Sequence, residues 1–363
     1  MTKDVPFSSK RLLLTLTLCA CSVILLENHD LADGQSFPLR LAAVGAGLGV
    51  CFLFFLPAVW MKKRGGSDVL TLVRRSSPAV RGIAAVVYCL CFLYIALYFL
   101  LPYTDMFCKK YYADTSPCLI ALLLLACCVY AAFKGANVIT RFGIFLFVLA
   151  LVTNGLLFGG SLSTLDFRNG SLGFEGSPGG FWQDTVYFIT PCFIAALFVC
   201  LSDSARQFKT RHVLLALLLT GLKYAAVLFF ITFSVGAYAA RQAYSAFVLS
   251  RVAHFGSFAG IESFYMALST MSVFMIVSLL LGCMDRAVGK SGSLPVTVFL
   301  TVTVFALHWL SEQYSSVKEF FSRPELLIGF SFAAAVVLPV ALMLTDIVKK
   351  KLKNRLKERS RHA

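Results

Sequence analysis

The residues best placed to do chemistry are two charged side chains inside long apolar stretches. Lys223 lies about ten residues into the stretch Val213–Ala239, and Glu262 lies near the start of Ile261–Cys283. Burying a charge in an apolar medium is costly, so both residues are candidates for coupling to an ion or a substrate. The long stem of Lys223 can also carry its ammonium toward the surface, and Glu262 can simply stabilise a helix N-terminus.

A second group of candidates surrounds a proline near the centre of the stretch Thr185–Leu201. Pro191 lies between Thr190 and Cys192. Proline removes a backbone donor and displaces the turn before it, and the carbonyl and amide groups freed in an interrupted helix can bind a small zwitterion. Proline kinks also occur in helices that bind no ligand, so this alternative stays open.

The apolar stretches of the chain divide into two halves, which begin with Leu12–Leu26 and Thr185–Leu201. We expect a ligand site where these two stretches meet. The first apolar stretch, Leu12–Leu26, is short and contains a run of small residues before Glu27. The sequence therefore predicts ligand-binding residues in both helices: Cys19, Ala20, Cys21 and Ser22 in the first, and Phe188, Thr190, Pro191 and Cys192 in the other.

The elements that must position these residues are membrane-spanning helices. The 363 residues are 58% hydrophobic and only 14% charged, whereas about a quarter of the residues in a soluble domain are charged. About 20 apolar residues are needed to cross a bilayer as a helix. We predict a single all-α membrane domain over residues 1–363 with ten spans: Leu12–Leu26, Leu39–Trp60, Gly82–Leu101, Pro117–Phe133, Phe142–Phe158, Thr185–Leu201, Val213–Ala239, Ile261–Cys283, Leu294–Leu310 and Leu326–Leu344.

The distribution of positive charge predicts the orientation of these spans. Of the 33 Lys and Arg residues, 24 fall on one side of the predicted membrane and eight on the other, and Lys223 lies inside a span. The positive-inside rule places the richer side, with both termini, in the cytoplasm. The basic tail, residues 347–363, can also rest on anionic lipid. The net charge of +15 is thus a topology signal, and we expect no nucleic-acid partner.

Three connections on the predicted outer side are longer than simple turns. Gly159–Asp184 is rich in Gly and Ser and is expected to be irregular. In Arg241–Gly260, apolar residues at helical spacing predict a short helix lying at the outer interface. Ser311–Pro324 is polar and charged and is expected to form a loop.

No pattern in the sequence predicts an enzyme, a metal site or a cofactor. P-loop, dinucleotide-binding and HExxH motifs are missing from the chain. Most of the twelve cysteines lie in apolar stretches, where a thiol behaves as a small hydrophobe. Cys108 and Cys118 lie near each other on the predicted outer side, and whether they pair is left open.

Scattered short motifs resemble the spore germination permease family, the B subunits of nutrient-germinant receptors. The segment from Tyr130 through Gly135 to Arg141 is similar to its tyrosine followed by G-I-E-x-I-x-R, with Asn137 where the family usually has glutamate. Thr115-Ser-Pro117 is similar to its threonine-x-proline before the fourth span. Leu249-Ser-Arg251 and Gly260-Ile261-Glu262 are similar to its L-x-R and R-I-E elements, with Gly260 where the family usually has arginine.

This resemblance implies a fold, a function and partners. The family lies within the amino acid–polyamine–organocation superfamily, so it implies a five-plus-five inverted repeat. It also implies an inner-membrane subunit of the spore that senses an amino acid or similar small germinant, together with an A subunit and a lipoprotein C subunit.

Two other hypotheses remain. The chain could be an amino-acid transporter of the same superfamily, coupled to protons through Lys223 or Glu262. It could also be a ten-span membrane acyltransferase, which would need an essential histidine such as His29 or His212 at the membrane face.

Overall fold

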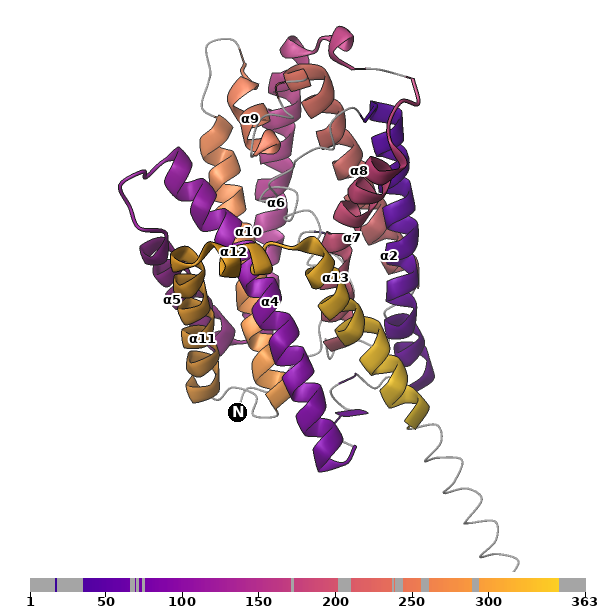
Figure 1. The fold of residues 1–363 in the computed structure, drawn as a ribbon, viewed down its shortest axis with the longest axis vertical. Coiled ribbons are helices and arrows are strands. Elements are labelled where there is room, and N and C mark those ends of the chain that lie inside the picture. The colour runs from indigo at the N-terminus through magenta and orange to yellow at the C-terminus, as the bar shows by residue number, and fades with distance from the viewer. Residues whose placement is uncertain are drawn as a thin grey trace, which may run out of the picture.

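The computed structural model describes an all-α protein whose helices run roughly along its long axis (Figure 1). It describes residues 17, 35–65, 69, 72–73, 76–170, 173–201, 210–236, 238, 244–255, 261–288 and 294–345. The α-helices are α2 (Phe37–Gly65), α4 (Pro78–Lys110), α5 (Pro117–Lys134), α6 (Ala136–Ser161), α7 (Pro178–Leu201), α8 (Thr210–Phe230), α9 (Ser245–Val252), α10 (Ile261–Val288), α11 (Leu294–Gln313), α12 (Ser315–Phe321) and α13 (Pro324–Phe332). Two 3₁₀ turns, η1 (Leu162–Thr164) and η2 (Phe167–Asn169), and two π-helical turns, η3 (Ile231–Val235) and η5 (Ala333–Val337), complete the order.

Eight helices of the described part are long and apolar enough to cross a membrane. They are Phe37–Met61, Pro78–Lys110, Pro117–Lys134, Val138–Thr164, Thr210–Val235, Ile261–Met284, Pro295–Gln313 and Pro324–Thr345. Each overlaps one predicted span. The predicted span Leu12–Leu26 lies outside the described residues, apart from Thr17. The remaining one, Thr185–Leu201, falls on helix α7, whose side chains are described as far as Ile189.

Local sequence explains where several helices begin and end. Helices α4, α5 and α13 each start at a proline, a residue whose fixed φ and missing N–H suit the first helical turn. Gly135 separates α5 from α6 with φ +93°, a conformation that residues with a Cβ rarely adopt. Gly135 of the family motif therefore forms the turn between two antiparallel spans.

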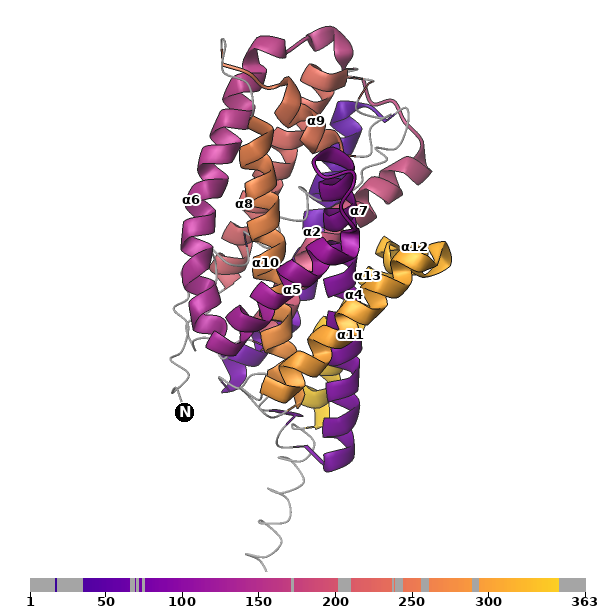
Figure 2. The ribbon, with the colours of Figure 1, turned by 90° about the vertical axis from the view of Figure 1, so that its left-hand side faces the viewer.

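The helices form two packed groups. Helix α2 packs along α7 and α8, while α4, α5, α10 and α11 contact one another and α6 packs on α10. The tilted helices α5 and α11 lie side by side (Figure 2). Buried aromatic side chains fill the interior, among them Tyr88, Phe92, Phe99 and Tyr265. We call the end of each helix that the charge pattern assigns to the cytoplasm its inner end, and the opposite one its outer end.

The predicted loop Ser311–Pro324 is wrong. Helix α11 continues to Gln313, and α12 then forms a short helix beside α4 that projects from the bundle (Figure 2). The Tyr94 hydroxyl of α4 lies 2.8 Å from the carbonyl oxygens of both Phe320 and Arg323. Tertiary contacts with α4 therefore fix a segment whose polarity alone indicated a loop.

The prediction of a short helix within Arg241–Gly260 is confirmed, but its predicted position at the outer interface is wrong. Helix α9 exists, but its residues from Ser245 to Ser250 are all buried. The Phe247 ring packs edge-to-face on Tyr111 and Tyr265. The helix therefore packs into the protein, although its apolar spacing fits a lipid surface equally well.

The outer connection between α6 and α7 is a strap that crosses the outer ends of α8 and α2. The Asp166 amide donates to the Phe233 carbonyl in the π turn η3 (2.8 Å), and the Ser36 amide donates to the Glu175 carbonyl (2.9 Å). A π turn leaves backbone groups outside the regular helical pattern, and such turns are frequent at functional sites. The segment predicted to be irregular is thus ordered by backbone hydrogen bonds at two places.

Helices α2 and α7 approach each other closely at Gly47, which yields the first testable prediction. A Cβ at Gly47 would lie 3.2 Å from the Phe188 Cβ and 3.3 Å from the Thr185 carbonyl oxygen, whereas one at Gly45 or Gly49 would meet nothing within 4 Å. Gly47→Leu should separate the helices and destabilise the fold by about 1–3 kcal/mol. Thermal unfolding in detergent measures the change. Gly45→Leu and Gly49→Leu are matched controls, and equal losses in all three variants would contradict the packing argument.

Candidate functional site

The candidate site is built on the face of α7 that packs against α2. Both helices run from the outer to the inner end. Just before them, Gln35 Nε2 donates to the Ser177 carbonyl at 2.9 Å, and further in Cys51 Sγ lies 3.8 Å from the Ile189 carbonyl. Ala43, Gly47 and Cys51, spaced four apart, give α2 a small-residue face. Small residues let two membrane helices approach closely.

Phe188 is the aromatic centre of this face. Its side chain is only 3% exposed, and its ring meets Tyr224 of α8 edge-to-face at 4.9 Å. Such pairs favour a fixed geometry. Phe188, a predicted ligand-binding residue, therefore lies at the junction of α2, α7 and α8.

The other predicted ligand-binding residues are placed only in part. Cys19, Ala20, Cys21 and Ser22 lie outside the described residues. Thr190, Pro191 and Cys192 follow Phe188 in α7, where the backbone is described and the side chains are not. The backbone stays helical from Pro178 to Leu201, so the predicted interruption at Thr190-Pro191 is wrong. A proline can remain inside a helix when neighbouring groups satisfy the freed carbonyl.

The two predicted coupling residues differ in their surroundings. Lys223 is half-buried on α8, directly before Tyr224. Glu262 Oε2 lies 3.6 Å from Arg251 Nε, which links α10 to the end of α9, and both side chains are partly exposed. An exposed ion pair of this kind contributes at most about 1 kcal/mol. Its position suits the structural interpretation of Glu262.

The family-motif residues lie at the inner end of α5 and the start of α6. Tyr130 is 65% exposed, and the Lys134 ammonium lies 5.3 Å from its ring centroid. Arg141 is also exposed on α6. Apart from the turn at Gly135, these residues lie on the surface.

Sequence reasoning missed a buried acid one turn outward from Phe188. Asp184 is 5% exposed, and Arg40 of α2 is 9% exposed. Residues four apart share a helix face, so Asp184 and Phe188 lie on the same side of α7. Within the described part of the chain, Asp184 Oδ2 has no hydrogen-bond partner. A signal existed: Arg40 is the second residue of a predicted span, and Asp184 immediately precedes another.

Burial raises the pKa of Asp184, which lies just outside the predicted span. Desolvation is the larger effect, and the nearby Arg40 guanidinium opposes it. The net result is a pKa of about 6 instead of 3.8. Asp184 can thus change protonation under mildly acidic conditions.

A second polar cluster holds α12 against the outer ends of α4 and α11. Lys318 Nζ lies 3.0 Å from Glu312 Oε1 and 3.5 Å from Asp105 Oδ1. Lys109 and the Tyr244 hydroxyl approach the other Asp105 oxygen at 2.7 and 3.3 Å. Burial opposes the charge on Lys318, but the two acids outweigh it and raise the pKa of the ammonium.

A buried histidine lies one turn inward from this cluster. His308 is fully buried, and its Nε2 lies 3.1 Å from Thr104 Oγ1. The Thr104 hydroxyl lies 3.0 Å from the carbonyls of Leu100 and Leu101. Since a hydroxyl has one proton to donate, Thr104 donates it to the backbone and accepts from His308. His308 therefore carries its proton on Nε2 and fastens α11 to α4.

Among the described residues, no group of three or more His, Cys, Asp or Glu side chains could hold a metal ion. Cys108 and Cys118 are both free thiols. Instead of a disulfide, Cys108 Sγ approaches the Thr115 carbonyl at 3.3 Å.

These helices define a multi-span membrane protein with a transporter-type fold. The structure is similar to that of Mhp1, a nucleobase-cation-symport-1 family transporter, solved in a closed conformation with bromovinylhydantoin bound. The TM-score is 0.54 at 14% identity, over 94% of this chain and 95% of that chain. At this identity the similarity concerns the fold alone, which is of the Mhp1-like, LeuT type.

The sequence comparison then gives the family. Residues 46–305 match the profile of the family described as Spore germination protein, so the chain belongs to that family. The family resemblance seen in the short motifs is confirmed. The matched region contains α7, α8 and most of α2. The comparison with curated proteins gives no match.

The raised pKa of Asp184 predicts a pH-dependent stability. Between about pH 4 and pH 6 the unfolded chain has released this proton and the folded chain retains it. Raising the pH through this window therefore lowers stability, by up to about 3 kcal/mol. Asp184→Asn should remove this contribution, which a pH series of thermal unfolding in detergent measures. Asp114→Asn, which changes an exposed acid on the outer side, should keep the wild-type slope. The same slope in Asp184→Asn would refute the assignment.

The ion cluster on α12 yields a separate prediction. Lys318→Met leaves Asp105 and Glu312 without their shared cation and should lower the stability by about 1–2 kcal/mol. Lys318→Met combined with Glu312→Gln should recover part of the loss. Arg323→Gln, which removes an exposed pair with Glu319, serves as a control and should leave the midpoint of thermal unfolding unchanged. A wild-type midpoint in Lys318→Met would show that the cluster does not hold α12.

Proposed function

We propose that this protein is the membrane subunit of a spore nutrient-germinant receptor, which binds an amino acid or similar small germinant and triggers germination. Membership of the spore germination protein family and a transporter-type fold support this proposal. The observation that carries it is the pairing of Asp184 and Phe188 on the face of α7 that packs on α2.

This face offers what a small zwitterion requires. The Asp184 carboxylate can accept hydrogen bonds from an ammonium group. Arg40, across the α2–α7 interface, which we call the seam, supplies the opposite charge for a carboxylate. The apolar surface of Phe188, one turn deeper, suits a short aliphatic side chain. The ligand would enter from the outer side. The other residues that the sequence predicts to bind it are Thr190, Pro191 and Cys192 of α7 and Cys19, Ala20, Cys21 and Ser22 of the first predicted span.

We further propose ten spans arranged as a five-plus-five inverted repeat. If residues 12–26 and α7 open the two halves, then α2 corresponds to α8, α4 to α10 and α5 to α11. The members of each pair run in opposite directions, as inversion requires, and each pair is in contact. Both termini would lie in the cytoplasm, and the protein would lie in the inner membrane of the spore with the A and C subunits of the receptor as partners.

A genetic experiment tests the receptor proposal. Deleting the gene from the spore former should abolish the response to at least one amino-acid germinant, and expression of the intact gene should restore it. Unchanged responses to every nutrient germinant in a broad panel would sink the proposal.

Variants of the seam test the site itself. Asp184→Asn should shift the germinant dose–response about tenfold or more, because a hydrogen bond to a charged group contributes about 1.5–3 kcal/mol. Phe188→Leu, Pro191→Ala and Lys223→Ala should also shift the dose–response. Glu262→Gln is the control and should respond as the wild type does. Immunoblots of spore membranes show whether each variant is present at the normal level. Wild-type dose curves for all four variants would show that the site lies elsewhere.

An amino-acid transporter is the second candidate, favoured by the fold and by the half-buried Lys223 on α8. Uptake of labelled amino acids into proteoliposomes separates the two functions. A sensor binds its ligand without uptake, whereas a proton-coupled transporter accumulates it when a pH gradient is applied.

A further inference from the structure

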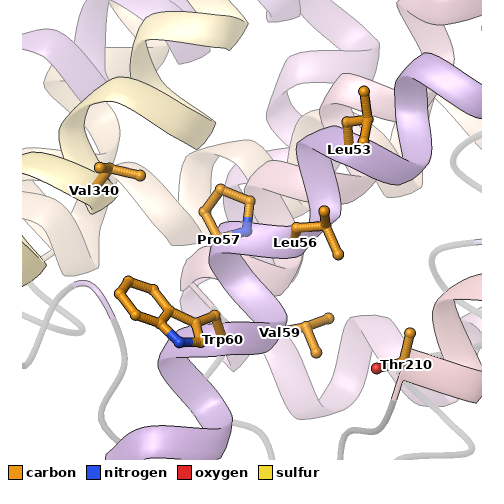
Figure 3. A pocket seen from close by; sticks show the side chains of 7 residues that line it. All are labelled: Leu53, Leu56, Pro57, Val59, Trp60, Thr210 and Val340. Atoms are coloured by element: carbon orange, nitrogen blue, oxygen red, sulfur yellow. The ribbon is translucent and has the colours of Figure 1, made fainter.

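An apolar groove lies between the inner halves of α2, α8 and the last span. Leu53, Leu56, Pro57, Val59 and Trp60 of α2 form one wall, and Thr210 and Val340 face it from the other two helices (Figure 3). Its volume of about 490 Å³ is within the range of small-molecule sites. Leu53, Leu56 and Trp60 are between 37% and 59% exposed, so the groove opens to the surroundings of the bundle.

The ends of the predicted spans place the groove at the depth where the hydrocarbon layer meets the headgroups. Trp60 ends the predicted span on α2, and Thr210 begins α8. Tryptophan is enriched at this boundary because its ring is apolar and its N–H can donate to a headgroup. The apolar residues from Leu53 to Trp60 therefore lie at the level of the acyl chains of the inner leaflet.

Basic residues follow each wall of the groove in the sequence. Lys62, Lys63 and Arg64 come within one helical turn after Trp60, and the exposed Arg211 comes directly after Thr210. The basic run beginning at Lys349 follows the span that carries Val340. Positive charge at the inner surface attracts anionic headgroups.

We propose that this groove binds an anionic glycerophospholipid of the inner leaflet. One acyl chain lies along Leu53, Leu56 and Val340, and the Trp60 indole and the exposed Arg211 bind the phosphate. This site is at the opposite end of α2 from Arg40 and does not depend on the proposed germinant binding. Helices of both predicted halves line the groove, α2 from the first half and α8 and the last span from the second. A bound lipid would therefore link the two halves.

Tryptophan fluorescence provides a direct test, because the chain has only three tryptophans. In a Trp182→Phe, Trp309→Phe variant, Trp60 is the sole emitter. The full chain is reconstituted in bilayers of phosphatidylcholine with increasing brominated phosphatidylglycerol, or with brominated phosphatidylcholine as the comparison. Selective binding predicts half-maximal quenching at a several-fold lower mole fraction of the anionic lipid.

Matched variants in this background test the two halves of the site. Val340→Phe fills the groove and should abolish the preference, while Val302→Phe, at an exposed position on α11, should retain it. Arg211→Gln should weaken the preference about fivefold, and Arg168→Gln on the outer side should leave it unchanged.

Two outcomes would overturn the proposal. Equal quenching by both lipids would show an unselective contact with the bilayer. No quenching of Trp60 by either lipid, with normal quenching of a variant that retains only Trp309, would show that protein covers the groove.

Discussion

The close parallel contact of α2 with α7 is the constraint on which the other features depend. With no Cβ at Gly47, the two backbones approach closely enough for Phe188 to reach Tyr224 on the third helix. Lipid tails are as apolar as leucine, so burial alone does not hold two membrane helices together, and close van der Waals packing must contribute. The same contact brings the Arg40 guanidinium near enough to Asp184 to act on its carboxyl group.

Polar groups at the outer end are used in two different ways. Around α12, each charge of Lys318, Asp105 and Glu312 has a partner, so the cluster fixes one segment to another. On α7, Asp184 is buried with an oxygen that has no hydrogen-bond partner among the described residues. An unsatisfied buried carboxylate costs stability and is typically retained where a ligand or a proton binds. This contrast explains why the α7 face, and not the larger ion cluster, is the candidate site.

The sequence predicts the helices better than it predicts their contacts. Spans of about 20 apolar residues are recognisable because the bilayer imposes their length, and eight of the predicted ones match described helices. Helix α12 was missed because Tyr94 and Lys318 stabilise it through contacts distant in sequence. The break at Pro191 was expected from proline chemistry, which neighbouring helices can override. Asp184 was overlooked because its burial follows from the register of α2 and α7, a property that no local pattern contains.

The strap over the outer ends restrains the helices that it connects. Its hydrogen bonds to Phe233 on η3 and to Ser36 beside α2, together with its direct continuation into α7, tie three helices at one end. Further toward the inner end, the close packing at Gly47 holds α2 against α7 a second time. Displacements among these three helices are therefore restrained at the outer end, and the last span joins them to α4. An occupant between α2 and α7 would then act against these restraints, and a displacement of α7 would pass to α4 through the last span, which packs on both.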